Sequence, residues 1–180
     1  MIAIKLHGTS GSGKSWVAHQ LLGRYPNSSH PEGFTRVDVP RDMLPQPLII
    51  LGKYDTNCGG MDTMTAGEGI ALFKKCALLD YNIFYEGLLQ SEYWGKIGSE
   101  LEFFPHIYAF MDTPIEVCIE RVKARRLAKG NTKPLDETNT RDRVRKIDNL
   151  RRKLNSQGKR VALINHEHPL EDLLELYAQS

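Results

Sequence analysis

Residues 8–15 carry the pattern Gly-x-x-x-x-Gly-Lys-Ser, which constrains the fold of this chain more than any other feature. Alternating apolar residues precede it at positions 2–6, and a helix-forming run follows it. Glycines in such a loop let backbone N–H groups converge on an anion at a helix N-terminus, while the lysine reaches the β- and γ-phosphates and the serine can ligate Mg²⁺. A chance glycine-rich turn would not need this strand-loop-helix context. The pattern predicts that these residues bind a nucleoside triphosphate: Gly8, Ser10, Gly11, Ser12, Gly13, Lys14, Ser15 and Trp16.

Strand-like apolar runs alternate with helical patterns along the 180 residues, a length that suits one domain. We expect strands at residues 34–39, 48–51, 82–85, 106–111 and 160–164. We expect helices at 16–24, 66–80, 114–128, 144–154 and 170–177, with turn residues at 26–29 after the first. This alternation predicts a single α/β domain over residues 1–180, with a parallel sheet and helices on both faces.

Composition excludes several classes of protein. No apolar stretch approaches the roughly 18 residues of a membrane span, and the N-terminal strand lacks the features of a signal peptide, so we expect a cytoplasmic protein without a membrane partner. The three cysteines, at positions 58, 76 and 118, are odd in number and widely spaced. They indicate neither a disulfide framework nor a zinc site.

Acidic residues follow several of the expected strands. Ligands of open α/β sheets bind beyond the carboxyl ends of the strands, which selects Asp38, Glu86 and Asp112. Glu86 ends an apolar strand, so we expect it to complete a Mg²⁺ site with Ser15 or to act as a base. Asp38 is a second candidate, whereas Asp112 is expected to be a strand-end or capping residue.

The segment 52–63 is dense in polar, aromatic and flexible residues. Its paired glycines, Gly59 and Gly60, allow close approach to a ligand, Tyr54 could stack on a base, and Asn57 or Asp62 could hydrogen-bond the edge of that base. An ordinary surface loop is the alternative. Because the segment leaves the expected ligand edge of the sheet, we favour substrate recognition.

Basic charge is concentrated in one part of the chain. Residues 121–160 contain 15 Lys and Arg against 4 Asp and Glu, whereas the remainder has 9 against 18. Such a segment can be a phosphate-binding lid, a nucleic-acid contact surface or a solvated helix face, and we expect the lid and basic helices over residues 121–157. Arg121, Arg125 and Arg126 are the candidates for stabilising a transferring phosphoryl group.

The phosphate loop, the strand that ends in Asp112-Thr113-Pro114, the helix after it and its arginines resemble the thymidylate kinase and deoxynucleoside kinase superfamily. The segments 52–63 and 85–89 are similar to those of its phage 5-hydroxymethyluracil DNA kinases. The resemblance implies a P-loop NTPase of the nucleoside-monophosphate-kinase type, a three-layer sandwich with a five-stranded parallel sheet and an Arg-rich lid. It also implies use of ATP and Mg²⁺ to phosphorylate 5-hydroxymethyluracil in phage DNA, within the host cytoplasm.

Two other functions remain open at this point. A kinase for free deoxynucleotides or deoxynucleosides would have the same loop and lid, and a binding module without transfer activity would retain the nucleotide site. The sequence also leaves open whether the chain forms a homodimer.

The chain departs from thymidylate kinases at residues 37–42, where an acidic, glycine-rich loop is expected. An alcohol acceptor benefits from a base that takes its proton, and Asp38, Asp42 and Glu86 could supply one. The resemblance to deoxynucleoside kinases, which carry a carboxylate after the second strand, makes Asp38 the first choice for this base. Arg41 is then assigned to the acceptor site, and Glu86 to Mg²⁺.

Overall fold

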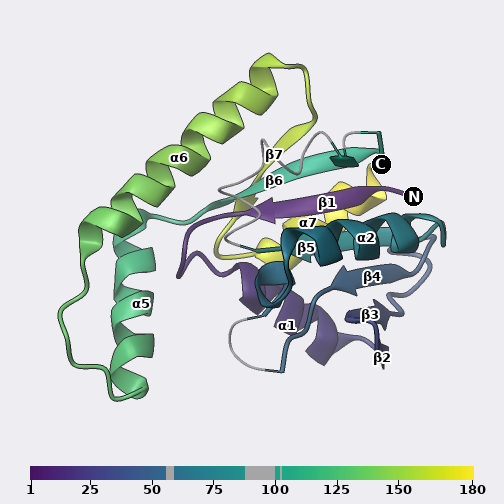
Figure 1. Ribbon diagram of the computed structural model, residues 1–180. Coiled ribbons are helices and arrows are strands. Elements are labelled where there is room, and N and C mark those ends of the chain that lie inside the picture. The colour runs from purple at the N-terminus through teal and green to yellow at the C-terminus, as the bar shows by residue number, and fades with distance from the viewer. Residues whose placement is uncertain (56–58, 88–99, 102) are drawn as a thin grey trace.

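The computed structural model describes residues 1–55, 59–87, 100–101 and 103–180 (Figure 1). A seven-stranded sheet with the order β2-β3-β4-β5-β1-β6-β7 forms its centre. The strands are β1 (Ala3–His7), β2 (Asn27–His30), β3 (Phe34–Val37), β4 (Leu48–Leu51), β5 (Asn82–Glu86), β6 (His106–Asp112) and β7 (Val161–Asn165). The helices are α1 (Lys14–Arg24), α2 (Ala66–Ala77), α5 (Ile115–Ala128), α6 (Glu137–Ser156) and α7 (Pro169–Ala178), with a 3-10 turn, η1 (Met61–Thr63).

The sheet is mixed, and it is larger than the five strands expected. Strands β4, β5, β1, β6 and β7 run parallel, whereas β2 pairs antiparallel with β3 and β3 antiparallel with β4. Every side chain of β2 is exposed. Its sequence is polar and shows no apolar alternation, which predicts turn residues there. Backbone pairing with β3 makes the segment a strand.

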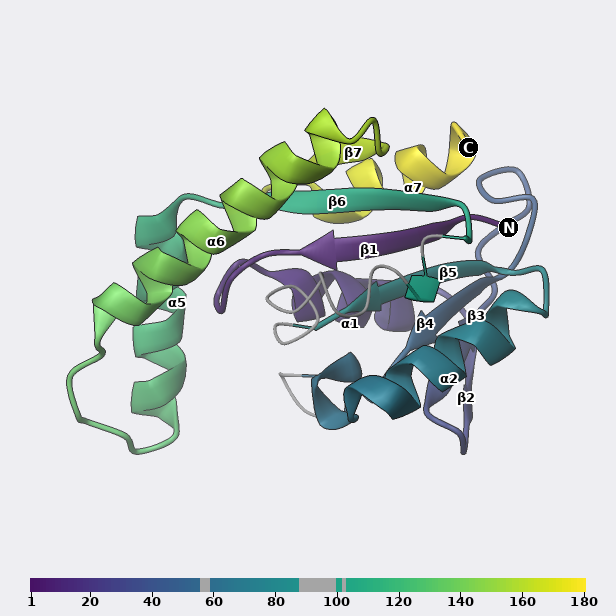
Figure 2. The same cartoon turned by 45° about the horizontal axis from the view of Figure 1, so that its top comes forward.

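Helices cover both faces of the sheet (Figures 1 and 2). On one face, α1 and α7 pack against a core that contains Ile4, Leu6 and Phe84. On the other face, α2 packs against β4 and β5, and Ile147 and Leu154 of α6 pack against Tyr108 and Phe110 of β6. The structure therefore has three layers, and β1 is buried along its whole length at the centre.

Local signals explain the helix boundaries. Helix α2 begins with a capping box in which Thr65 accepts a hydrogen bond from the Glu68 N–H, and the Glu68 carboxylate accepts one from the Thr65 N–H at 2.8 Å. It ends at Ala77, three residues before the expected end, and Asp80 then adopts a positive φ of 55°. In the part of the chain that the structure describes, no helix is long and apolar enough to cross a membrane.

Helix α5 lies beyond the carboxyl end of β1, and α6 begins beside α5 and runs back over the sheet toward the start of β7 (Figures 1 and 2). A connection over residues 129–136 joins the two helices, and Asp136 caps α6 by accepting a hydrogen bond from the Thr138 N–H at 3.0 Å. The segment expected to form a lid is thus a pair of helices, of which α5 and the start of α6 lie at the phosphate-loop end of the sheet.

Candidate active site

The glycine-rich loop connects β1 to α1, as the sequence predicts. Gly11 and Gly13 adopt positive φ values of 81° and 101°, which favour glycine over residues with side chains. A Cβ on Gly11 would lie 2.3 Å from the carbonyl oxygen of Cys118, so this glycine also lets the loop pack against α5. Gly8 lets the loop close tightly on itself, because a Cβ there would lie 2.4 Å from Oγ of Ser12.

Lys14 lies at the start of α1 with its ammonium group folded back over the loop. Its Nζ donates a hydrogen bond to the carbonyl oxygen of Thr9 at 3.1 Å, and the side chain is 7 % exposed. Oγ1 of Thr9 and Oγ of Ser12 are buried and have no hydrogen-bond partner among the described residues. A lysine, buried hydroxyls without a partner and a helix N-terminus are groups that can together bind an anion.

Ser15 and Glu86 form the second part of the site. The Ser15 hydroxyl donates a hydrogen bond to Oε1 of Glu86 at 2.8 Å, and Glu86 ends β5 with a side chain that is 1 % exposed. Burial raises the pKa of Glu86, while the charge of Lys14 and the hydrogen bond from Ser15 oppose that rise. A Cβ on Gly60 would lie 2.7 Å from Oε1 of Glu86, so only a glycine lets the 52–63 segment pass this close to the carboxylate.

These groups open into a cavity of about 810 Å³. Eleven of the residues that line it belong to the nucleotide, acceptor, metal or arginine sites predicted above. They are Ser10, Gly11, Gly13, Lys14, Ser15, Trp16, Gly59, Asp62, Glu86, Arg121 and Arg125. The structure therefore brings most of the predicted site together in one place.

The three candidate arginines separate into two groups. Arg121 donates a hydrogen bond from Nη1 to the carbonyl oxygen of Gly11 at 3.4 Å, and Arg125 lies one helical turn further along α5. Arg126 lies outside the cavity: its Nη2 donates to the carbonyl oxygen of Lys133 at 3.0 Å, beyond the end of α5. Residues four apart share a helix face, whereas Arg126 is rotated by about 100° from Arg125. Of the three candidate arginines, Arg121 and Arg125 therefore line the cavity, and Arg126 does not.

Asp38 and Arg41 do not reach the cavity, and their expected place in the site is wrong. Val37, the last residue of β3, pairs with Leu48, the first residue of β4. Because β3 is antiparallel to β4, its carboxyl end lies at the amino edge of the parallel strands, opposite the phosphate loop. There Asp38 forms an exposed ion pair with Arg36, Oδ1 to Nη2, at 2.9 Å, and Arg41 is exposed.

The 52–63 segment, predicted to recognise the substrate, is only partly as predicted. Gly59 and Asp62 line the cavity, but Tyr54 does not; it packs against the core and makes an edge contact with the ring of His19 at 5.7 Å. Burial and the charges of Glu86 and Asp62 raise the pKa of Tyr54 well above its ordinary value. Tyr54 thus packs beneath the site instead of presenting its ring to a base. Asn57 lies outside the described residues.

Five further residues line the cavity: Thr63, Met111, His166, Glu167 and Pro169. Thr63 belongs to the 52–63 segment predicted to recognise the substrate. His166 follows β7, and its Nδ1 lies 2.9 Å from the carbonyl oxygen of Asp112 at the end of β6. Because they lie in a loop after the last expected strand, we expect His166 and Glu167 either to line the adenine side of a nucleotide site or to be exposed, and the structure places both in the lining of the cavity.

A lysine and a histidine lie in the central strand beneath the site. Lys5 and His7 of β1 are both 0 % exposed, and Nζ of Lys5 lies 4.8 Å from the centre of the Tyr85 ring. Burial lowers the pKa of Lys5 to about 7, although the charges of Glu86 and Asp62 oppose the shift. The ring of His7 stacks on Phe110 at 4.6 Å, and burial lowers its pKa well below the ordinary value.

Comparison with known proteins identifies the family. The model of the 5-hmdU DNA kinase family matches residues 3–155. The chain belongs to the 5-hmdU DNA kinase family. The 5-hmdU DNA kinase of Pseudomonas phage PaMx11 is 31% identical, covering 96% of each chain, and that of Pseudomonas phage M6 is 27% identical, covering 94% of each. The 5-hmdU DNA kinase 1 of Salmonella phage ViI is 29% identical over 66% of this chain and 56% of its own.

Proposed function

We propose that this member of the 5-hmdU DNA kinase family transfers the γ-phosphoryl group of ATP to the hydroxymethyl group of 5-hydroxymethyluracil in phage DNA, inside the infected host. The observation that carries the proposal is the match to a relative named 5-hmdU DNA kinase over 96% of both chains. The three-layer fold with a glycine-rich loop between β1 and α1 supports a P-loop kinase of the nucleoside-monophosphate-kinase type, with α5 and α6 as its arginine-bearing lid.

The donor site is assigned to the glycine-rich loop. Backbone N–H groups of residues 10–15 and the ammonium of Lys14 hold the triphosphate, for which Lys14 exchanges its present hydrogen bond to Thr9. Arg121 and Arg125 approach from α5 and stabilise negative charge on the transferring phosphoryl group. Arg126 acts indirectly, by holding the 129–136 connection against the end of α5.

The residues at the Ser15–Glu86 pair fit Mg²⁺. Both groups supply oxygen, which this ion prefers, and a buried carboxylate whose pKa is raised by burial gains from a cation beside it. When bound there, Mg²⁺ would neutralise charge on the phosphates. Glu86 and Ser15 hold the ion, and Gly60 keeps the space over Glu86 free of a side chain.

Asp62 replaces Asp38 as the proposed base. Asp62 lines the same cavity as Lys14 and Glu86, whereas Asp38 lies at the opposite edge of the sheet. The hydroxymethyl oxygen forms a bond to the γ-phosphorus while the bond from that phosphorus to the β,γ-bridging oxygen breaks, which yields a phosphate ester and ADP. The hydroxyl proton passes to the Asp62 carboxylate.

Phosphate transfer from γ-labelled ATP tests the proposal. The acceptors are DNA containing 5-hydroxymethyluracil, ordinary DNA, free thymidine, thymidylate and 5-hydroxymethyl-deoxyuridylate. We expect label on the modified DNA alone. Label confined to a free nucleotide or nucleoside would instead assign the chain to precursor metabolism, and nucleotide binding without transfer to any acceptor would make it a binding module.

Two matched variants test the base. Asp62→Asn is expected to lower kcat on modified DNA by roughly 10²- to 10⁴-fold, the usual contribution of a general base, with little change in ATP affinity. Asp38→Asn removes the same charge at the far edge and should leave kcat near the wild-type value. Equal losses in the two variants, or a loss in Asp38→Asn alone, would refute the assignment.

A further inference from the structure

The basic charge of this chain continues past the cavity along α6. Residues 143–160 contain eight Lys and Arg and one acidic residue, Asp148. Outside residues 121–160 the chain has twice as many acidic as basic residues. The charge is therefore separated within the molecule, and much of the basic part lies along α6, which runs from the end where α5 lies toward the start of β7 (Figure 1).

Helix α6 turns its cations away from the sheet. Its buried residues Thr140, Ile147 and Leu154 recur every seven positions, and the last two pack against β6. Arg145 and Arg152 lie on the side of the helix opposite Ile147, with side chains that are 75% and 73% exposed. Lys146 and Lys153 are exposed beside them. We call Arg145, Lys146, Arg152 and Lys153 the basic face of α6.

Acidic neighbours neutralise this face only in part. Arg145 lies 3.4 Å from Asp142 and Arg152 lies 2.7 Å from Asp148, and exposed pairs of this kind contribute little energy. Lys146 and Lys153 form no ion pair with any residue that the structure describes. Four exposed cations, in two pairs about two helical turns apart, therefore have two carboxylates beside them, and Asp148 also pairs with Arg151 at 2.8 Å.

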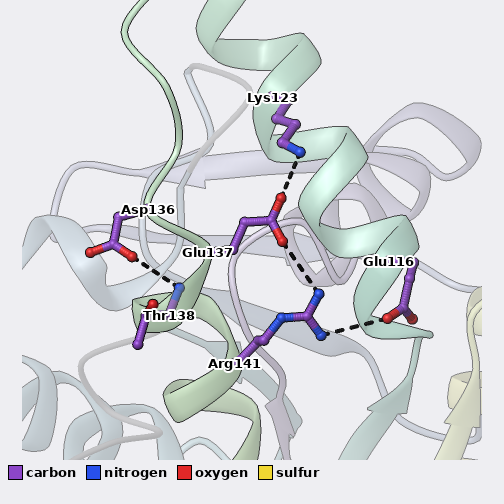
Figure 3. Close-up of polar contacts among 6 residues, drawn as sticks. All are labelled: Glu116, Lys123, Asp136, Glu137, Thr138 and Arg141. Carbon is purple, nitrogen blue, oxygen red and sulfur yellow. Dashed lines mark hydrogen bonds and ion pairs between the residues drawn. The ribbon is translucent and has the colours of Figure 1, made fainter.

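Ion pairs join the first two turns of α6 to α5 (Figure 3). The carboxylate of Glu137, in the first turn of α6, lies 2.7 Å from Nζ of Lys123 and 3.3 Å from Nη2 of Arg141. Arg141 also reaches Glu116 of α5 at 3.6 Å. These contacts hold the first two turns of α6 against the helix whose Arg121 lines the cavity. From there α6 runs back over β6 toward the start of β7, so a polymer bound along α6 extends away from the cavity end of the sheet.

We infer that the basic face of α6 binds the sugar-phosphate backbone of the DNA whose modified base enters the cavity, an inference that rests on the proposed function. Duplex DNA carries one charge per about 1.7 Å of its axis, so the roughly 10.5 Å between residues seven apart on a helix spans about six phosphate charges. The excess of acidic residues elsewhere repels DNA from the rest of the surface. Charge thus directs the polymer toward α6, the helix whose first turns are paired with α5 beside the cavity.

The salt dependence of DNA binding tests this inference without any chemical step. Binding of a labelled duplex is measured by fluorescence anisotropy from 50 to 200 mM salt for the wild type, Arg145→Gln/Arg152→Gln and Lys146→Gln/Lys153→Gln. Each double variant is expected to bind more weakly and to flatten the slope of log K against log salt by about 1.8, or 0.9 for each lost phosphate contact. The affinity for ATP should not change.

The control is Arg24→Gln/Arg41→Gln, which removes two exposed arginines away from α6. It should retain the wild-type slope. Wild-type slopes in both α6 variants, an equal loss in the control, or no binding of DNA by the wild type would overturn the inference. Failure of the proposed function is recognised separately: the wild type would then bind the duplex with the expected slope but transfer no phosphate to modified DNA.

Discussion

Lys5 is a buried lysine in the central strand, and the free-energy cost of burying its charge predicts how the stability of the protein depends on pH. The side chain is 0 % exposed and lies over the Tyr85 ring, and burial lowers its pKa from 10.5 to about 7. Because the pKa is lower in the folded than in the unfolded protein, the unfolded protein binds more protons between these two values. Lys5 therefore destabilises the fold fully below pH 7, and the penalty declines as pH rises toward 10.5.

The size of the effect follows from the two pKa values. A shift from 10.5 to about 7 corresponds to a penalty of about 5 kcal/mol at low pH, at 1.36 kcal/mol for each pKa unit. Between pH 7 and pH 9 the folded protein loses its remaining share of the proton while the unfolded chain keeps most of its own. Over that interval the wild type should gain about 2 kcal/mol relative to a variant without the amine.

Lys5→Met is the variant of choice, because methionine is unbranched, has a similar length and carries no charge. Urea unfolding of both proteins at pH 7, 8 and 9 gives the difference in the free energy of unfolding, in which other titrating groups cancel. We expect Lys5→Met to be the more stable protein at pH 7, with its advantage reduced by about 2 kcal/mol at pH 9. The exposed Lys129→Met is the control for loss of one lysine. A difference that is the same at all three pH values would refute the reasoning.

Three further predictions concern the site and its supports. Glu86→Gln keeps the shape of the side chain but removes its charge, so the Mg²⁺ concentration for half-maximal activity should rise at least tenfold while the ATP-binding loop still folds; an unchanged requirement would exclude Glu86 as a ligand. Gly60→Ala places a methyl group 2.7 Å from Oε1 of Glu86 at a φ of 80°, so it should destabilise the protein by about 1–3 kcal/mol in urea unfolding and lower kcat, whereas Gly67→Ala, in open space on α2, should do neither. Thr65→Ala removes the N-cap of α2 and should cost about 1 kcal/mol with kcat unchanged, and loss of activity without loss of stability would contradict a purely structural role.

The sequence predicted the parts of the fold and site that depend on adjacent residues. The glycine-rich loop, the strand before it and the helix after it form one continuous segment, and Lys14 and Ser15 fall where the pattern requires. Glu86 was also predicted from local order, because it ends an apolar run that forms β5 next to β1. In these cases neighbours in the chain determine which groups meet.

Arg126 shows where a pattern of charge is too coarse to place a side chain. The three arginines lie within six residues and carry the same charge, so charge alone could not separate them. Helical geometry does: Arg121 and Arg125 are four residues apart and share the face that lines the cavity, whereas Arg126 points to the connection after α5. Counting positions along the helix, rather than charges, would have made this distinction.

The error over Asp38 arose from long-range pairing, which apolar periodicity cannot reveal. The rule about carboxyl ends holds only for strands parallel to β1, and the exposed, polar β2 gave no sign that a hairpin separates α1 from the next parallel strand. With the hairpin included, the second strand of the parallel set is β4, and its carboxyl end leads into the 52–63 segment. A carboxylate that follows this strand comes from that segment, and Asp62 is the one there that lines the cavity with Glu86. The reasoning that selected Asp38 therefore selects Asp62 once the direction of each strand is known.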